Sequence, residues 1–358
     1  MEKGREGLLT GVYAVVHMAA DLSCAFLMYA YVIGKGQWYL WLLAYNFCAF
    51  AMQMPIGLIA DGLDRNSQAA AGGCIGVLAG LGLGAAGYPG AASVIAGLGN
   101  ACFHAGGGID VLNTSHGKMT PLGIFVAPGA MGIFLGGILG RRGPGPALGI
   151  SFLMVLSAAI IWVVSDRQGL WHSSGNVPFS LEMAASGHSS SWLPAACFLG
   201  TVILRSYSGM VQSFPWKEHV AGSAWLLTGA VVLGKMAGGI LGDRLGPREA
   251  ALRSMCAAGA GFICLRFPVP GILAVLFWNM SMPLTLWAAA RAFPGARGFS
   301  FGLLTFGLFL GFCPVYLEGN CVQPGSAGVW AAPSSPVGMA FMALVSLFIL
   351  RWGLERVK

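Results

Sequence analysis

The stretch "GILGDRLGPR", residues 239–248, has a second copy earlier in the chain, "GLIADGLDR", residues 57–65. Each copy places a glycine four residues before an aspartate, and an arginine follows within the same segment. Asp61 and Asp243 are separated by about half of the 358-residue chain. Self-similarity at a fixed spacing is the sign of a repeated structural unit, so the two halves are predicted to share one fold.

The residues around both copies are strongly apolar. Hydrophobic residues make up 56% of the chain and charged residues only 9%, whereas soluble domains carry about 25% charged residues. A soluble protein of this length would need a charged surface, so the composition indicates a chain whose solvent is lipid. We therefore expect an all-α integral membrane protein.

Twelve apolar stretches are long enough to cross a bilayer, which takes about 20 residues per helix. They cover residues 8–33, 38–60, 69–88, 91–112, 121–140, 147–165, 193–215, 221–242, 249–266, 268–290, 298–317 and 335–351. The longest connection is polar and falls at the middle of the chain. We expect an N-terminal six-helix half at 1–165, a linker at 166–192 and a C-terminal six-helix half at 193–358.

The distribution of lysine and arginine predicts the orientation in the membrane. With the N-terminus inside, thirteen of the 20 basic residues fall on the cytoplasmic side and five on the outer side, while Arg205 and Lys235 lie within spans. Cytoplasmic loops carry such an excess. We expect a multi-pass protein of the cell inner (plasma) membrane with both termini and the linker cytoplasmic. The net charge of +7 is then explained by basic residues that set the orientation in the membrane, and it gives no reason to expect nucleic acid as a partner.

Both copies of the repeat resemble the loop motif G-x-x-x-D-R-x-G-R of the major facilitator superfamily, found there after the second and eighth helices. The resemblance implies the major facilitator fold, with twelve transmembrane helices in two pseudo-symmetric six-helix halves and transport by alternating access. It also implies a gating network at the cytoplasmic side, made here by Asp61, Arg65, Asp243, Arg244 and Arg248. We add Asp110, which is predicted near the inner membrane surface, and Lys235 to this gating set.

Further segments are similar to one branch of that superfamily, the fosmidomycin-resistance-like transporters. These segments are "HMAAD" (17–21), "QMPIGLIAD" (53–61), "GLGNACFHAGGG" (97–108), "GIFVAPGAMGIFLGG" (123–137), "LRSYSGM" (204–210), "GKMAGGILGDRLG" (234–246) and "FPGARGFSFGL" (293–303). The branch covers many substrates, so the resemblance implies no particular one. It favours efflux, by antiport, over uptake.

Ionisable side chains at membrane depth are the candidates for function, since each costs about 2.5–3.5 kcal/mol at a helix centre on insertion scales. His17 and Asp21 are four residues apart and share a helix face near the middle of the first span. We predict that Asp21, with His17, is the proton-coupling site. His104 and Asn100 share a face of the fourth span at a similar depth, and we assign them to substrate binding.

In the superfamily, helices one, four, seven and ten line the central cavity. By resemblance, helix seven then contributes Arg205 and Tyr207, and helix ten contributes Trp278 and Asn279, with Pro283 as a kink site. This set suits a small polar or amphipathic organic molecule, including an anionic one. His104 and Asp110 are six residues apart, so about 100° per residue places them about 120° apart around the helix. We therefore expect them to serve different sites.

Structural roles stand beside these assignments. His104 can be a packing residue that is hydrogen-bonded to a neighbouring helix. Asp21 can be a structural acid paired with Lys235, and Arg205 can clasp two helices together. These alternatives stay open at the level of sequence.

The leading function is a proton-coupled secondary active transporter that uses the proton gradient, requires no cofactor or resident metal, and acts as a monomer in the lipid bilayer. The nine cysteines are scattered, without a CxxC pair, which argues against a disulfide framework or a zinc site. One alternative is a divalent-metal transporter with ligands drawn from His17, Asp21, Cys102, His104, Cys24, Met52 and Met54. A non-transporting membrane sensor or structural protein is another. An enzyme is disfavoured, because no HExxH, GxSxG or P-loop pattern occurs.

Overall fold

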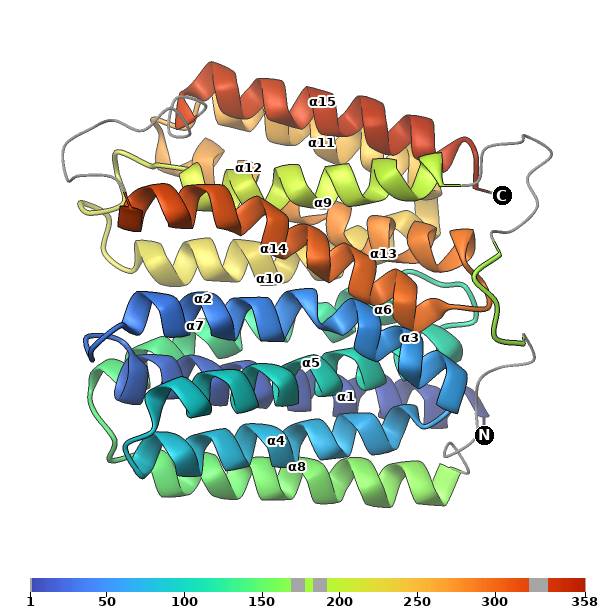
Figure 1. Cartoon of the computed structure of the whole chain (residues 1–358). Coiled ribbons are helices and arrows are strands. Elements are labelled where there is room, and N and C mark those ends of the chain that lie inside the picture. The colour runs from blue at the N-terminus through green and yellow to red at the C-terminus, as the bar shows by residue number, and fades with distance from the viewer. Residues whose placement is uncertain (1, 169–177, 183–191, 322–333, 358) are drawn as a thin grey trace. The chain divides into compact units, whose positions relative to one another are not determined.

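The computed structural model describes residues 2–168, 178–182, 192–321 and 334–357, and every regular element in these ranges is helical (Figure 1). The first six predicted spans correspond to α1 (Glu2–Leu27) with a π-helical turn η1 (Met28–Val32), α2 (Trp38–Asn46), η2 (Phe47–Ala51), α3 (Gln53–Leu63), α4 (Asn66–Ala85), α5 (Pro89–Thr114), α6 (Thr120–Val126), α7 (Pro128–Arg141) and α8 (Ala147–Gln168). The other six correspond to α9 (Leu193–Val211), α10 (Ser223–Leu245), α11 (Pro247–Ile263), α12 (Pro268–Asn279), α13 (Ser281–Ala292), α14 (Arg297–Cys321) and α15 (Pro336–Leu354). Most of the expected linker at 166–192 lies outside the described residues.

Nine helices of the described chain are long and apolar enough to cross a membrane. The predicted spans outside this set are α5, α9 and α11. The last is only 17 residues long, while polar residues such as His104 and Arg205 lower the hydropathy of the first two. Two helices with candidate functional residues, α5 and α9, therefore lie outside this set, while α1, α10 and α12 belong to it.

Prolines account for two breaks within spans. The tenth span divides at Met280 into α12 and α13, because Pro283 has no N–H to donate to the carbonyl of Asn279 four residues earlier. The fifth span divides between α6 and α7 at Pro128, the first residue of α7. The predicted kink at Pro283 is confirmed.

The described residues pack into two compact units. Unit 1 comprises residues within Met1–Gly117, Ile124–Leu181 and Pro294–Phe306, and unit 2 comprises residues within Lys118–Gly123, Glu182–Phe293 and Gly307–Lys358. The start of α6 thus packs with the later half of the chain, and the start of α14 packs with the earlier half. Sequence order alone does not assign these two segments to their units.

Glycines set the helix spacing in unit 1, where α4 packs against α5 and α8, and α1 packs against α7 (Figure 1). A Cβ at Gly99 of α5 would lie 2.5 Å from the backbone nitrogen of Val77 on α4. On α7, a Cβ at Gly132 or Gly136 would clash with backbone carbonyls of α1. Such close backbone approach is what small residues permit between helices in a membrane, and it sets the spacing of α4 from α5 and of α1 from α7.

In unit 2, α11 packs against α12 and α15, and α9 packs against α13 and α15 (Figure 1). The buried core there contains Phe262 of α11, Trp278 of α12 and Met339 of α15. This packing holds the polar residues of α9 against the break between α12 and α13.

Candidate functional site

Three predicted residues from two helices meet in unit 1. His17 Nε2 on α1 lies 3.2 Å from a carboxylate oxygen of Asp21, and His104 Nε2 on α5 lies 3.6 Å from the other oxygen. The two Nε2 atoms are 2.9 Å apart, and both imidazoles are buried. We refer to these three residues as the His–Asp cluster.

Backbone carbonyls fix the tautomers of both rings. His17 Nδ1 lies 2.8 Å from the carbonyl oxygen of Phe125, and His104 Nδ1 lies 2.9 Å from that of Asn100. A carbonyl oxygen only accepts, so each Nδ1 donates a hydrogen bond, and a neutral ring then has its lone pair on Nε2. Without an added cation, the His–Asp cluster therefore presents only acceptors at its centre.

Two neighbours shape the His–Asp cluster. Asn100 Nδ2 donates to Asp21 Oδ1 at 3.2 Å and approaches Cys24 Sγ at 3.4 Å. Gly129 of α7 faces the pair on α1, where a Cβ would clash with both His17 Nε2 and Asp21 Oδ2. Asn100 thus contacts the carboxylate of Asp21 through its side chain and the ring of His104 through its backbone carbonyl. Its assignment to substrate binding stays a prediction.

Asp110 lies in a separate polar group, although it is only six residues from His104. Its Oδ2 accepts from the hydroxyl of Tyr13 at 2.5 Å and from Ser67 Oγ at 2.8 Å, and the residue is 1% exposed. The two side chains therefore have different hydrogen-bond partners. Its carboxylate contacts the hydroxyl groups of Tyr13 and Ser67 and the side chain of Asn66, and no basic residue of the described chain pairs with it.

The predicted residues of unit 2 form a second polar group. Arg205 Nη1 donates to Ser281 Oγ at 3.3 Å. Trp278 Nε1 donates to Ser208 Oγ at 2.8 Å, and that hydroxyl donates to the backbone carbonyl of Arg205. The group therefore joins α9 to both sides of the break at Met280.

The remaining predicted residues of unit 2 are partly buried. Asn279 Nδ2 donates to the carbonyl oxygen of Val275 on its own helix. Tyr207 on α9 and Lys235 on α10 are partly exposed, and each has interactions within the described chain. The hydrogen-bond partners of Asp21 all belong to unit 1, and Lys235 is not among them.

The two repeat aspartates make matching contacts with helix N-termini. Asp61 accepts from the backbone N–H groups of Gly298 and Phe299, in the first turn of α14, at 2.8 and 2.9 Å. Asp243 accepts from Met119 and Thr120, at the start of α6, at 2.7 and 2.9 Å. A carboxylate there satisfies free N–H donors and complements the helix dipole. The repeat in sequence is thus also a repeat in structure.

The arginines of the repeat do not pair with these aspartates. Arg65 and Arg244 are exposed, and Arg248 Nη2 lies 3.4 Å from the carbonyl oxygen of Leu354. In the described chain the aspartates contact helix N-termini, so an Asp–Arg network is not the arrangement in this structure. The N-terminal amides already satisfy both oxygens of each carboxylate.

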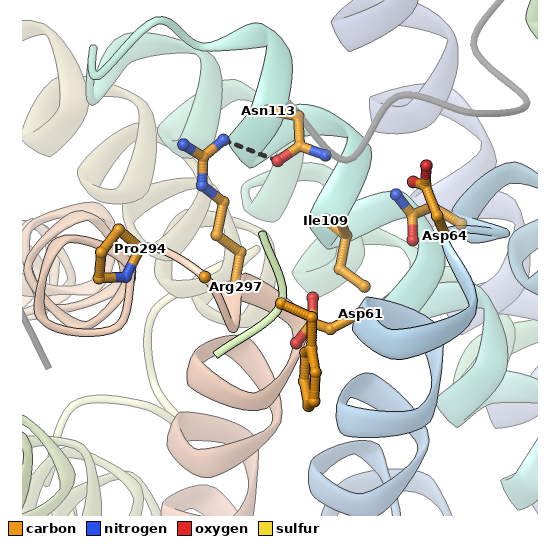
Figure 2. Close-up of a pocket in the computed structure, with 9 residues that line it drawn as sticks. Asp61, Asp64, Ile109, Asn113, Pro294 and Arg297 are labelled. Carbon is orange, nitrogen blue, oxygen red and sulfur yellow. Dashed lines mark hydrogen bonds between the residues drawn. The ribbon is translucent and has the colours of Figure 1, made fainter. Parts of the chain in front are cut away.

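A small polar depression lies beside the first repeat copy (Figure 2). It is lined by Asp61, Asp64, Asn66, Ile109, Asn113, Phe179, Pro294, Gly295 and Arg297. Arg297 Nη1 donates to Asn113 Oδ1 at 2.7 Å. Its lining residues on α5, Ile109 and Asn113, lie five and nine residues beyond His104, so this depression is distinct from the His–Asp cluster.

The His–Asp cluster is also a set that can hold a metal ion, because its three ligand atoms lie within 4.8 Å of one another. Cys102, proposed as a fourth ligand, is two residues from His104 on the same helix and is not part of this set. Within the described residues, the structure thus assembles three of the seven residues considered for a metal from sequence.

Sequence reasoning missed several partners. Tyr13 lies four residues before His17 on the same helix face, a spacing that could have identified it. The contacts of the Phe125 carbonyl and of the amides at the starts of α6 and α14 could not be predicted. Almost every residue carries the same backbone N–H and C=O groups, so the sequence does not mark the ones that bind.

The fold of the whole chain is similar to those of several solved membrane transporters. The fucose:proton symporter FucP of E. coli, solved in the outward conformation, superposes with a TM-score of 0.61 at 15% identity over 97% of this chain and 98% of that one. The human organic anion transporter MFSD10 gives a TM-score of 0.66 at 14% identity over 96% and 98% of the two chains. The chain has the major facilitator fold.

A third match is a bacterial homologue of the iron transporter ferroportin in its outward-facing state, with a TM-score of 0.64 at 13% identity over 100% of this chain and 98% of that one. No protein-family model and no curated protein matches the sequence. Likeness at this identity establishes a multi-span membrane fold. The chain's own residues must therefore carry any argument about cargo.

Proposed function

We propose that this chain is a proton-coupled secondary active transporter that moves a small polar or amphipathic organic molecule across the cell membrane by alternating access. The observation that carries the proposal is the buried His–Asp cluster within membrane helices of this fold. Ionisable groups at such depth commonly mark ion or proton pathways. The resemblance to fosmidomycin-resistance-like transporters adds support for efflux.

The contacts of the His–Asp cluster suit a single proton. Two Nε2 lone pairs face each other at 2.9 Å, and a proton on one ring would donate to the other. The carboxylate of Asp21 would balance the added charge. Proton loss on one side of the membrane and gain on the other would then couple the gradient to the movement of solute.

The contacts of the repeat aspartates support a gating role. Asp61 holds the start of α14, and Asp243 holds the start of α6. We propose that these hydrogen bonds form and break during transport, on the side that the basic residues predict to be cytoplasmic. The names of the neighbours, a fucose:proton symporter and an organic anion transporter among them, support transport rather than catalysis.

A proteoliposome assay tests the proposal. Purified protein is reconstituted around a trapped pH-sensitive dye, and sugars, amino acids and carboxylates are added in turn. We expect at least one solute to change the internal pH, with the change absent in Asp21→Asn. Protein-free liposomes and Glu249→Gln, at an exposed acid that pairs with Arg253, serve as controls. A folded protein that moves no protons with any solute would contradict the proposal.

Divalent-metal transport is the second candidate, favoured by the closeness of three ligand atoms in the His–Asp cluster. Metal-bound histidines usually donate their other ring N–H to a carbonyl or carboxylate, as both rings do here. Uptake of Co²⁺ or Zn²⁺ into the same proteoliposomes distinguishes the candidates. Saturable metal uptake that His104→Gln abolishes, without proton movement driven by organic solutes, would favour this second function.

A further inference from the structure

The guanidinium group of Arg205 on α9 is buried and has few hydrogen-bond partners. The residue is 8% exposed, and the group's contact within the described chain is a single donation to Ser281 Oγ at 3.3 Å. Guanidinium has five N–H donors in a planar fork. Most of these donors therefore lack an acceptor among the described residues.

No carboxylate balances the charge of Arg205. The sequences of α9, α12, α13 and α15 contain neither Asp nor Glu. Glu318 of α14, which also packs against α9, makes no ion pair with Arg205. The adjacent Ser208 and Trp278 are neutral and bond to each other. The charge is thus buried without a counter-ion in the described chain.

A buried charge without a counter-ion destabilises the folded state, so a purely structural role explains Arg205 poorly. Removing an ion from water costs several kcal/mol even after relaxation, and a paired partner normally offsets it. A clasp between α9 and α13 would need only a neutral donor to reach Ser281. The permanent charge of arginine is therefore better explained by an anion that arrives from outside the chain.

We infer that the transported solute is an organic oxyanion, and that Arg205 binds its carboxylate or phosphate group. This inference rests on the proposed transport function and adds the substrate class. The planar fork of arginine matches both groups through paired hydrogen bonds. Ser281 lies beside the fork, and the indole of Trp278 belongs to the same polar group. Unit 1 then binds the coupling proton, while unit 2 binds the anionic group.

Ligand-induced thermal stabilisation of the purified chain tests the inference, because a ligand that binds the folded state raises its stability by mass action. The probes are three matched pairs: benzoate and benzamide, succinate and succinamide, and glycerol 3-phosphate and glycerol. The proteins are the wild type, Arg205→Gln and Arg205→Lys. Arg291→Gln is the control, since Arg291 is an exposed arginine of α13.

We expect at least one anion to raise the unfolding temperature of the wild type and of Arg291→Gln, while its uncharged partner has no effect. Arg205→Gln should lose the shift, and Arg205→Lys should retain only part of it, since an ammonium cannot form the paired bonds. Carboxylates and phosphate are separated by which pair responds. Equal shifts in the wild type and Arg205→Gln, equal responses to both members of every pair, or no response at all would overturn the inference.

If Arg205→Gln does not fold, the wild-type comparison still tests the anionic class of the ligand, and Arg205→Lys, which keeps the charge, still tests the role of Arg205. The assay measures binding alone, so it also separates the two proposals. Anion binding through Arg205 without solute-driven proton movement would contradict the proposed coupling and keep this inference. Proton-coupled transport of an uncharged solute, without anion binding, would support the proposed coupling and contradict this inference.

Discussion

At the scale of single residues, helical spacing predicted the neighbours of Asp21 well. The four-residue step from His17 to Asp21 predicted their shared face, and the depth of His104 in its span placed it near that level. Sequence could not say that His104 would join His17 and Asp21, since this depends on the approach of α5 to α1. It also could not fix the ring tautomers, which backbone carbonyls set.

Replacing His104 tests its place in the His–Asp cluster. His104→Gln removes an ionisable ring that lies 2.9 Å from His17 Nε2, so we expect the pH dependence of transport to change. The measurement is the initial rate of solute-driven proton movement across a pH series. His116→Gln, at an exposed histidine bonded to Glu6, should leave the profile as it is. An unaltered profile in His104→Gln would assign His104 to packing alone.

At the scale of elements, the twelve predicted spans agree with the helices to within a few residues at most ends. Apolar length fixes where a span can lie, and Pro283 fixed the break in the tenth one. The ends differ where caps decide them: α3 continues to Leu63, because Asp64 adopts a left-handed conformation that ends the helix there. The contacts of α4 with α5 were not predictable, since glycines occur on every face of these helices.

Close packing of α4 against α5 should not tolerate a methyl group at Gly99. A Cβ there would meet backbone atoms of Val77 and Gly73 at 2.5 and 2.7 Å, and backbone cannot move aside cheaply. Overpacking of this kind costs about 1–3 kcal/mol. We expect Gly99→Ala to lower the unfolding temperature in detergent, while Gly82→Ala, where space is open, should change it little. Equal stability of both variants would contradict this packing.

The contact of Asp243 with α6 should matter for turnover. Asp243→Asn keeps one acceptor oxygen but loses the charge and one of the bonds to Met119 and Thr120. Hydrogen bonds to charged groups contribute about 1.5–3 kcal/mol each. We expect the maximal transport rate to fall more than the apparent affinity.

Glu249→Gln, at an exposed acid on the neighbouring helix α11, is the matched control for Asp243→Asn. Unchanged kinetics in Asp243→Asn would remove this contact from the transport cycle and leave it a helix cap.

At the scale of the whole molecule, the repeat and the span count predicted the major facilitator fold. The grouping of residues 118–123 with unit 2 and of 294–306 with unit 1 was not predictable. It arises because Asp243 and Asp61 bind helix starts that belong to the other half of the sequence. Sequence patterns report local periodicity, whereas these contacts join residues more than 120 positions apart.

Orientation in the membrane is a prediction from basic residues and can be measured. Tyr88→Cys and Lys118→Cys lie in exposed connections at either end of α5, in a background without the nine native cysteines. The excess of basic residues predicts that an impermeant maleimide labels Tyr88→Cys in intact cells and Lys118→Cys only after permeabilisation. The reverse pattern would invert the topology, and labelling of both from one side would contradict a single crossing by α5.

Proton coupling through Asp21 is tested most directly by comparing net accumulation with exchange. The probe is a radiolabelled form of the solute that moves most protons in the dye assay, and the proteins are the wild type and Asp21→Asn. Asp21→Asn keeps the shape of the side chain but removes the carboxylate that pairs with His17 and His104. We predict that a pH gradient drives accumulation by the wild type alone, while both proteins exchange internal for external solute. Accumulation by Asp21→Asn at the wild-type level would contradict a coupling role for the His–Asp cluster.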